Sequence, residues 1–229
     1  MSRQKFSCAT LRWHHYMDNS FIMKKSFLTF FILLLFPFLC LGQSATTASI
    51  SMINNDAEID TDLRYITNFL DIEYKKINFI GEGLKGNSFP IVATEIWNGE
   101  VVDSSTVIDT SEFPAPHLQK INDEEYEIRV ISMLTDEKRL RVMFRFPNFS
   151  TTREFDAVDT NEYSLRQADL INKKEITPGE TFFLLNYILP YEENGVKHYC
   201  SVGQSGSDVF NWGREFDLEH YIVFTMTFE

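Results

Sequence analysis

The stretch Arg139-Leu140-Arg141-Val142-Met143-Phe144-Arg145-Phe146 determines the fold class of this 229-residue chain. Every even-numbered residue in it is apolar, and three of the four odd-numbered residues are arginines. Successive side chains of a β-strand point to opposite faces, whereas a helix repeats about every 3.6 residues. We therefore predict a strand that buries one face and exposes the other to water.

The same alternation occurs upstream, in Glu125-Tyr126-Glu127-Ile128-Arg129-Val130. The polar residues 135–138 separate the two patterns, so we expect both strands to form one antiparallel hairpin. A second hairpin turn is predicted at Asn98-Gly99, after a strand over 91–97, because both residues tolerate a positive φ.

A third turn, Asn194-Gly195, is predicted to join a strand over 181–189 to one over 197–202. Pro190 ends the first of these strands because it has no N–H for the ladder. In a final strand over 220–228, His220 is in phase with four apolar residues, Ile222, Phe224, Met226 and Phe228.

Further strands are expected at 48–53, 72–80 and 152–158, and the polar segments 103–122 and 159–180 are interpreted as loops. Residues 62–71 are open between a strand and a short helix capped by Asp62. The chain is thus predicted to be all-β, an antiparallel β-sandwich of immunoglobulin-like or jelly-roll-like type with at most one short helix.

The N-terminal region has the features of a secretory signal over residues 23–42. Lys24 and Lys25 precede an apolar run over 27–41, and cleavage is expected before Gln43. Residues 1–22 are interpreted as an over-called start. Lipid attachment at Cys40 is a disfavoured alternative because bulky Leu39 precedes it. Residues 43–229 are expected to form a single domain, with two halves, 43–158 and 159–229, as the alternative.

Composition excludes several classes of protein. The chain has 33 Asp and Glu against 21 Lys and Arg, a net charge of −12, which argues against nucleic-acid binding. Its hydrophobic content of 44% argues against a disordered chain. Once the leader is removed, Cys200 is the one remaining thiol, so an internal disulfide is excluded and no transmembrane span is expected.

Several short motifs resemble those of a family of uncharacterised secreted proteins, about 200 residues long, from anaerobic Gram-negative gut bacteria. They are the signal end Gly42-Gln43, Phe69-Leu70-Asp71-Ile72-Glu73-Tyr74, Gly83-Leu84-Lys85-Gly86, Trp97-Asn98-Gly99, Tyr199-Cys200-Ser201-Val202, Gln204-Ser205-Gly206 and His220-Tyr221. The resemblance covers residues 43–229. It implies a secreted domain of unknown function and carries no activity to transfer.

No catalytic residue, metal ligand or cofactor is predicted. Cys200 lies near His198 and His220, but a thiol within a strand is usually a small buried apolar group. The segment 203–207 lacks the Gly-x-Ser-x-Gly spacing of a nucleophile elbow. The acidic residues between Asp56 and Asp62 are interpreted as solvated, with calcium binding as the alternative.

Aromatic residues are the candidates for ligand binding: Trp97, Trp212, Tyr191 and Phe210. Flat rings grouped on one surface stack on sugars or peptide side chains. The alternative is that both tryptophans cover the ends of the sandwich core.

These features favour an exported, non-enzymatic protein of the periplasm or cell surface that binds a protein, a glycan or another envelope component. A glycan-acting hydrolase with an unrecognised carboxylate pair is the first alternative, and a structural subunit of a surface assembly is the second. The oligomeric state and the ligand are open.

Overall fold

The computed structural model describes residues 49–54, 60–167, 173–199 and 209–229. The longer strands are β1 (Ile50–Asn54), β2 (Glu73–Ile80), β3 (Pro90–Trp97), β4 (Glu100–Asp109), β5 (Glu125–Leu134), β6 (Arg139–Arg145), β7 (Ser150–Asp156), β10 (Phe182–Ile188) and β13 (His220–Met226). The shorter ones are β8 (Ser164–Arg166), β9 (Lys173–Ile176), β11 (Tyr191–Glu193) and β12 (Val196–His198). The helices are α2 (Thr61–Phe69), α3 (Pro116–Gln119), α5 (Trp212–Glu215) and the 3₁₀ turns η2 (Glu82–Leu84), η3 (Thr110–Glu112) and η4 (Val209–Asn211).

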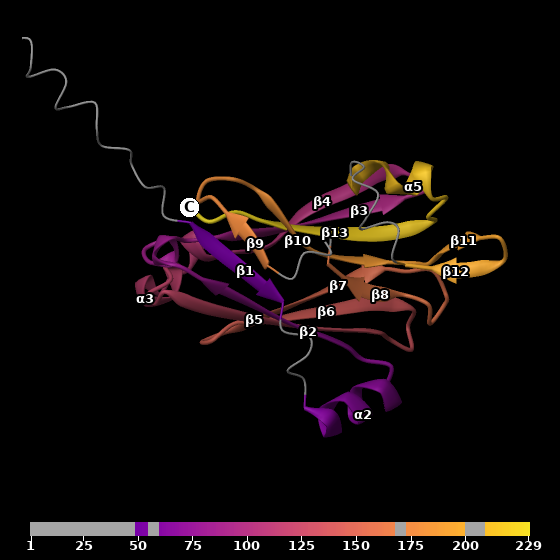
Figure 1. Cartoon of the computed structure of the whole chain (residues 1–229), viewed down its shortest axis with the longest axis horizontal. Helices are drawn as coiled ribbons and strands as arrows, with labels where there is room; N and C mark the ends of the chain where they lie inside the picture. Colours follow the sequence, from indigo (N-terminus) through magenta and orange to yellow (C-terminus); the bar gives the residue numbers. More distant parts are fainter. Residues whose placement is uncertain (1–48, 55–59, 168–172, 200–208) are drawn as a thin grey trace, which may run out of the picture. The chain divides into compact units, whose positions relative to one another are not determined.

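Two antiparallel sheets pack face to face, which confirms the predicted all-β sandwich (Figure 1). Sheet A has the strand order β7-β6-β5-β2-β1-β9, and sheet B has the order β4-β3-β13-β10-β8. The main core lies between them and contains apolar side chains from both sheets. Hairpin β11-β12 forms a separate two-stranded sheet.

Strand β6 shows why the alternating pattern specifies this fold. Leu140, Val142 and Phe144 have no exposed area and belong to the main core. The arginines between them face solvent, where Arg141 and Arg145 are exposed. Residues Leu134 and Leu140 are paired across the predicted β5-β6 hairpin, which is therefore confirmed.

Strand β13 is buried on both faces because an apolar core covers each face of sheet B at this strand. Its residues Ile222 and Phe224 enter the main core. Tyr221 and Val223 point to the opposite face, where they form a second core with Trp212 of α5. A strand covered on both sides has apolar residues in succession rather than in alternation.

The expectation that 103–122 and 159–180 are loops was wrong in part, because each segment contains strand residues. Strand β4 continues to Asp109, and β8 and β9 lie within the second segment. All three are edge strands of their sheets. An edge strand has neighbours on one side only and tolerates polar residues, so its sequence is hard to distinguish from a loop.

The Asn-Gly turns form as predicted, but one joins different strands. Asn98 and Gly99 have φ values of 49° and 76°, as a tight hairpin requires. Asn194 and Gly195 have the same conformation, yet they connect β11 to β12, both after Pro190. Strand β10 pairs with β13 and β8 instead.

Residues 61–69 form helix α2, and its N-cap is Asp60 rather than Asp62. The Asp60 carboxylate accepts hydrogen bonds from the backbone N–H groups of Asp62 (2.8 Å) and Leu63 (3.4 Å). With α3 and α5 there are three α-helices among the described residues, more than the one expected. None of the described helices is long and apolar enough to cross a membrane.

Residues 47–229 form one compact unit. Both sheets combine strands from before and after residue 158, since β1 pairs with β9 and β3 pairs with β13. The sequence alternative of two separate halves therefore has no counterpart in the strand pairing.

Candidate functional site at one end of the sandwich

A cavity of about 620 Å³ opens at the end of the sandwich where the β5-β6 turn lies. This volume falls in the range of about 300–1,000 Å³ that is usual for small-molecule sites. Its lining residues come from the end of α2 and the start of β2, from the β5-β6 turn, from the segment after β7, and from β10. They are Thr67, Asn68, Leu70, Asp71, Ile72, Glu73, Met133, Leu134, Thr135, Asp136, Lys138, Asp159, Thr160, Asn161, Tyr163 and Tyr187.

Two buried tyrosines form part of the cavity lining. The rings of Tyr163 and Tyr187 lie 5.5 Å apart, and both residues are buried. Burial raises the pKa of Tyr187 to about 12 and raises the pKa of Tyr163 as well. Both hydroxyls therefore keep their protons at neutral pH and remain hydrogen-bond donors.

Tyr163 links the cavity to a buried histidine. The backbone N–H of Val158 donates to the Tyr163 hydroxyl at 3.0 Å. The Tyr163 hydroxyl and Nδ1 of His220 lie 2.6 Å apart. Because Nδ1 is the one acceptor among the described partners of this hydroxyl, we assign the hydroxyl proton to the bond with Nδ1, which leaves the His220 proton on Nε2. Among the described residues, Nε2 has no hydrogen-bond partner.

Carboxylates dominate the charge of the cavity. Four of its lining residues are acidic, Asp71, Glu73, Asp136 and Asp159, whereas Lys138 is the one basic lining residue. Lys138 is already ion-paired with Asp159. Glu73 accepts a hydrogen bond of 3.0 Å from the Ser164 hydroxyl, which ties β2 of sheet A to β8 of sheet B. Such a lining favours ligands rich in hydrogen-bond donors.

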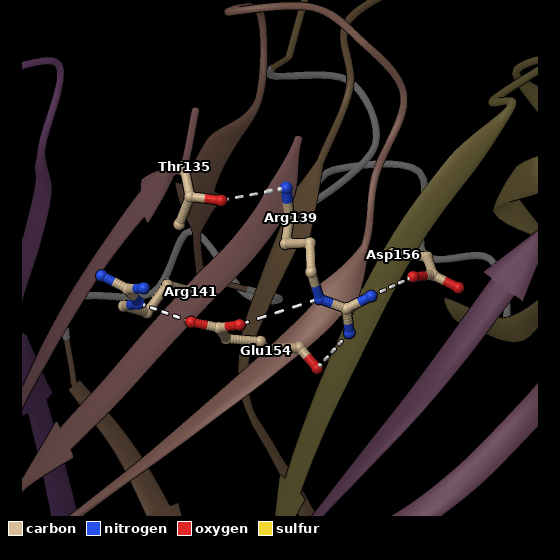
Figure 2. A network of polar contacts seen from close by, with 5 residues as sticks. All are labelled: Thr135, Arg139, Arg141, Glu154 and Asp156. Atoms are coloured by element: carbon tan, nitrogen blue, oxygen red, sulfur yellow. Dashed lines mark hydrogen bonds and ion pairs between the residues drawn. The ribbon is translucent and has the colours of Figure 1, made fainter. Parts of the chain in front are cut away.

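A polar network holds the strands beside this end of the sandwich together. Figure 2 shows Arg139 of β6 between Glu154 and Asp156 of β7. Arg139 donates to the Glu154 carbonyl at 3.1 Å and forms an ion pair with Asp156, and Arg141 donates to the Glu154 carboxylate at 2.7 Å. The network fixes β7, and hence the segment after it, against the β5-β6 hairpin.

Glu95 on β3 is a carboxyl group with an altered acidity near this network. Burial raises its pKa, the negative charges of Asp103 and Asp156 raise it further, and Arg139 opposes them. A carboxyl group whose pKa is raised beside a second carboxyl group is an arrangement that glycan hydrolases use. Glu95 does not line the 620 Å³ cavity.

The structure separates the aromatic residues that the sequence grouped as a ligand platform. Trp97 is half-buried and stacks on His220, with ring centroids 4.0 Å apart. Trp212 is 2% exposed and packs near Tyr221 in the second core. His220 and Tyr221 are adjacent in β13 and point to opposite faces, so the two tryptophans lie on opposite sides of sheet B.

The other two platform residues lie on the same side of sheet B as Trp212. Tyr191 is buried in the second core, where it stacks on His198 and packs against Phe216. Phe210 is 38% exposed and contacts Phe183 edge to face. The structure therefore places the rings of Trp212 and Tyr191 in the second core, and for Trp212 this agrees with the alternative interpretation of the tryptophans.

The remaining motifs are only partly described. Cys200 and the segment 203–207 lie outside the described residues, as do residues 55–59 of the acidic stretch. Asp60 has a structural role as the cap of α2. Within the described ranges, no group of three or more His, Cys, Asp or Glu residues is arranged to hold a metal ion.

No pattern in the sequence indicated Tyr163 or the cavity itself. The lining comes from segments between residues 67 and 187, and no local spacing brings them together. His220 did carry a signal, because a polar residue in phase with buried apolar ones in β13 must find a partner inside the protein.

Comparisons with protein-family models, with curated proteins and with solved structures found no match to this chain.

Proposed function

We propose that this chain is an exported, non-enzymatic binding protein of the cell envelope that takes a polar ligand, a glycan or a peptide segment, in the cavity at the end of its sandwich. The observation that carries the proposal is the 620 Å³ cavity itself, whose lining combines two tyrosines with carboxylate and amide groups. Sugar hydroxyls and peptide N–H groups are the donors that such groups accept.

Export is the part of the proposal that rests on the sequence. The charged start, the apolar run over 27–41 and the small residues before Gln43 support cleavage there. N-terminal sequencing of the protein from the envelope fraction is expected to begin at Gln43. Recovery of the intact precursor from the cytosol would refute export.

Binding is tested with purified residues 43–229 on an array of bacterial envelope glycans and short peptides. The double variant Asp136→Ala/Asp159→Ala removes two exposed acceptors of the cavity, and Asp123→Ala/Glu124→Ala removes the same charge from an exposed segment elsewhere. We expect the first variant to lose about tenfold in affinity and the second to bind normally. Equal behaviour of the two variants would refute the cavity as the site.

Hydrolysis of a glycan is a second candidate, favoured by the raised pKa of Glu95 near Asp156. The test is release of nitrophenol from a panel of nitrophenyl glycosides, and of reducing ends from purified peptidoglycan. Turnover that Glu95→Gln and Asp156→Asn each abolish would establish the enzyme. If the wild-type protein shows no turnover of these substrates, the result supports the binding function.

A further inference from the structure

Strand β4 presents an open edge of sheet B. In the described part of the chain, β4 is hydrogen-bonded as a strand to β3 alone. Residues 100–106 are exposed, and Val101 and Val102 expose 55% and 57% of their area. The backbone of an edge strand has N–H and C=O groups that no neighbouring strand takes up.

The direction of these groups follows from two contacts. Arg153 of β7 donates to the carbonyls of Thr106 and Val107, at 3.2 Å each, so the Thr106 carbonyl points away from β3. The register shifts at Val107, but from Thr106 back to Ser104 the pairing with β3 is regular. Backbone groups alternate in direction there, so those of Ser104 point away from β3 too. The hydroxyls of Ser104 and Thr94 lie 3.3 Å apart, as expected for a pair without backbone hydrogen bonds between them.

Arg153 also marks where the open edge ends. Its guanidinium supplies to Thr106 and Val107 the donors that a further strand would supply. The described residues of β7 donate no hydrogen bond to the backbone of residues 100–105. The open edge therefore runs from the β3-β4 turn to Ser105. Space for one more strand is therefore confined to this half of β4.

A shallow groove of about 480 Å³ adjoins the same half of β4. It lies between the β3-β4 turn and the η4-α5 segment, and its lining residues are Gly99, Glu100, Val101, Phe210, Asn211 and Arg214. Val101 and Phe210 supply apolar surface, and the exposed ion pair between Glu100 and Arg214 borders it.

The walls of the groove are held in a fixed relation by two glycines. A Cβ atom on Gly213 would lie 2.5 Å from the Gly99 Cα atom, so the turn and α5 are in direct backbone contact. A rigid groove beside an open edge is suited to recognition by strand addition. In that mode, main-chain bonds provide affinity and a side-chain pocket provides specificity.

We propose that the β4 edge binds an extended segment of a partner polypeptide as an additional strand, with one apolar side chain of that segment in the groove at Phe210. The segment is neutral or basic, because β4 carries Glu100 and Asp103 and the chain has a net charge of −12. The same charge opposes a second copy of this chain as the occupant. This site is separate from the cavity and does not depend on the function proposed for it.

The probe is a phage-displayed library of random twelve-residue peptides, selected on residues 43–229. We expect the selection to enrich neutral or basic peptides that contain one large apolar residue. When a selected peptide is bound, we expect amide exchange at Ser104 to become slower. Ser104→Pro removes an outward N–H, which an edge strand tolerates, and is expected to reduce peptide affinity at least tenfold, whereas Ser104→Thr retains it.

Phe210→Ala provides an independent variant, because an exposed ring is removed without a change in the backbone. We expect it to weaken peptide binding about tenfold while the protein keeps a cooperative unfolding transition, at a temperature slightly lowered by loss of the Phe183 contact. Failure to enrich peptides, or binding that Ser104→Pro and Phe210→Ala both retain, would overturn the proposal. So would a dimer of the protein by light scattering that Ser104→Pro dissociates, because the occupant would then be a second copy.

Discussion

His220 lies at the start of a strand face that is otherwise hydrocarbon. It has no exposed area, stacks on Trp97 and bonds to Tyr163. Burial lowers its pKa from 6.5 to about 4, although the negative charge of Asp156 acts in the opposite direction. The folded protein therefore holds the neutral imidazole at pH values where the unfolded chain binds a proton.

This difference predicts a loss of stability in mild acid. Because the folded pKa is below the unfolded one, the contribution is complete above pH 6.5 and is lost as the pH falls toward about 4. The loss amounts to about 3 kcal/mol at most. Urea unfolding between pH 4.5 and 7.5 measures it, and His220→Gln is expected to flatten the profile.

Glu95 acts with the opposite sign, because its raised pKa favours the folded state as the pH falls. Glu95 is present in the wild type and in the His220→Gln variant. The difference between their profiles of unfolding free energy against pH therefore reports on His220 alone. Parallel profiles for wild type and His220→Gln would contradict the prediction.

Gly213 provides a second prediction at the scale of one residue. Its missing Cβ leaves room for the backbone of Gly99, which a methyl group would approach to 2.5 Å. Alanine is the better helix former, but the clash outweighs this gain, so Gly213→Ala is expected to cost about 1–2 kcal/mol of unfolding free energy. Denaturant unfolding measures the loss. Glu215→Ala, on the exposed side of the same helix, is the control and should change stability by less than about 0.5 kcal/mol.

At the scale of elements, the nine-residue helix α2 has no buried residue. Leu63, Ile66, Phe69 and Leu70, the apolar side of its helical pattern, are all exposed. The helix therefore depends on local interactions, of which the Asp60 cap is one, rather than on the core. Such an element unfolds locally without the rest of the domain.

Asp60→Ala is expected to remove about 1 kcal/mol from the stability of α2 alone. Amide exchange at residues 64–70 should accelerate about fivefold, while the global unfolding free energy stays within about 0.5 kcal/mol of wild type. Asp62→Ala, at the position that the sequence suggested as the cap, should have the smaller effect. The reverse order of the two variants would show that the cap is assigned wrongly.

At the scale of the whole molecule, each sheet needs both ends of the chain. Without residues 159–229, β1 loses β9 and β3 loses β13, which is the central strand of sheet B. Residues 43–158 expressed alone are therefore expected to remain unfolded, with no cooperative thermal transition by circular dichroism. A folded fragment would restore the two-half interpretation.

The sequence by itself determined the strands that bury one face in the main core, such as β6, and the Asn-Gly turns. In these cases the information is local, because alternation and positive φ depend on neighbours in the chain. The sequence predicted the start of β4 through the Asn98-Gly99 turn, but not its continuation, because most of that edge strand is polar and exposed. Strands β8 and β9 escaped prediction because three or four residues are too few to show an alternating pattern.

Only the tertiary structure decided which strands pair, where Trp97 and Trp212 lie, and that a cavity exists. Pairing of β13 with β3 joins residues more than 120 positions apart, and the cavity lining comes from four separate segments. Long-range packing, rather than any local pattern, brings Tyr163, Tyr187 and His220 together. The reason is that burial depends on what covers a side chain, and the covering residues are distant in the sequence.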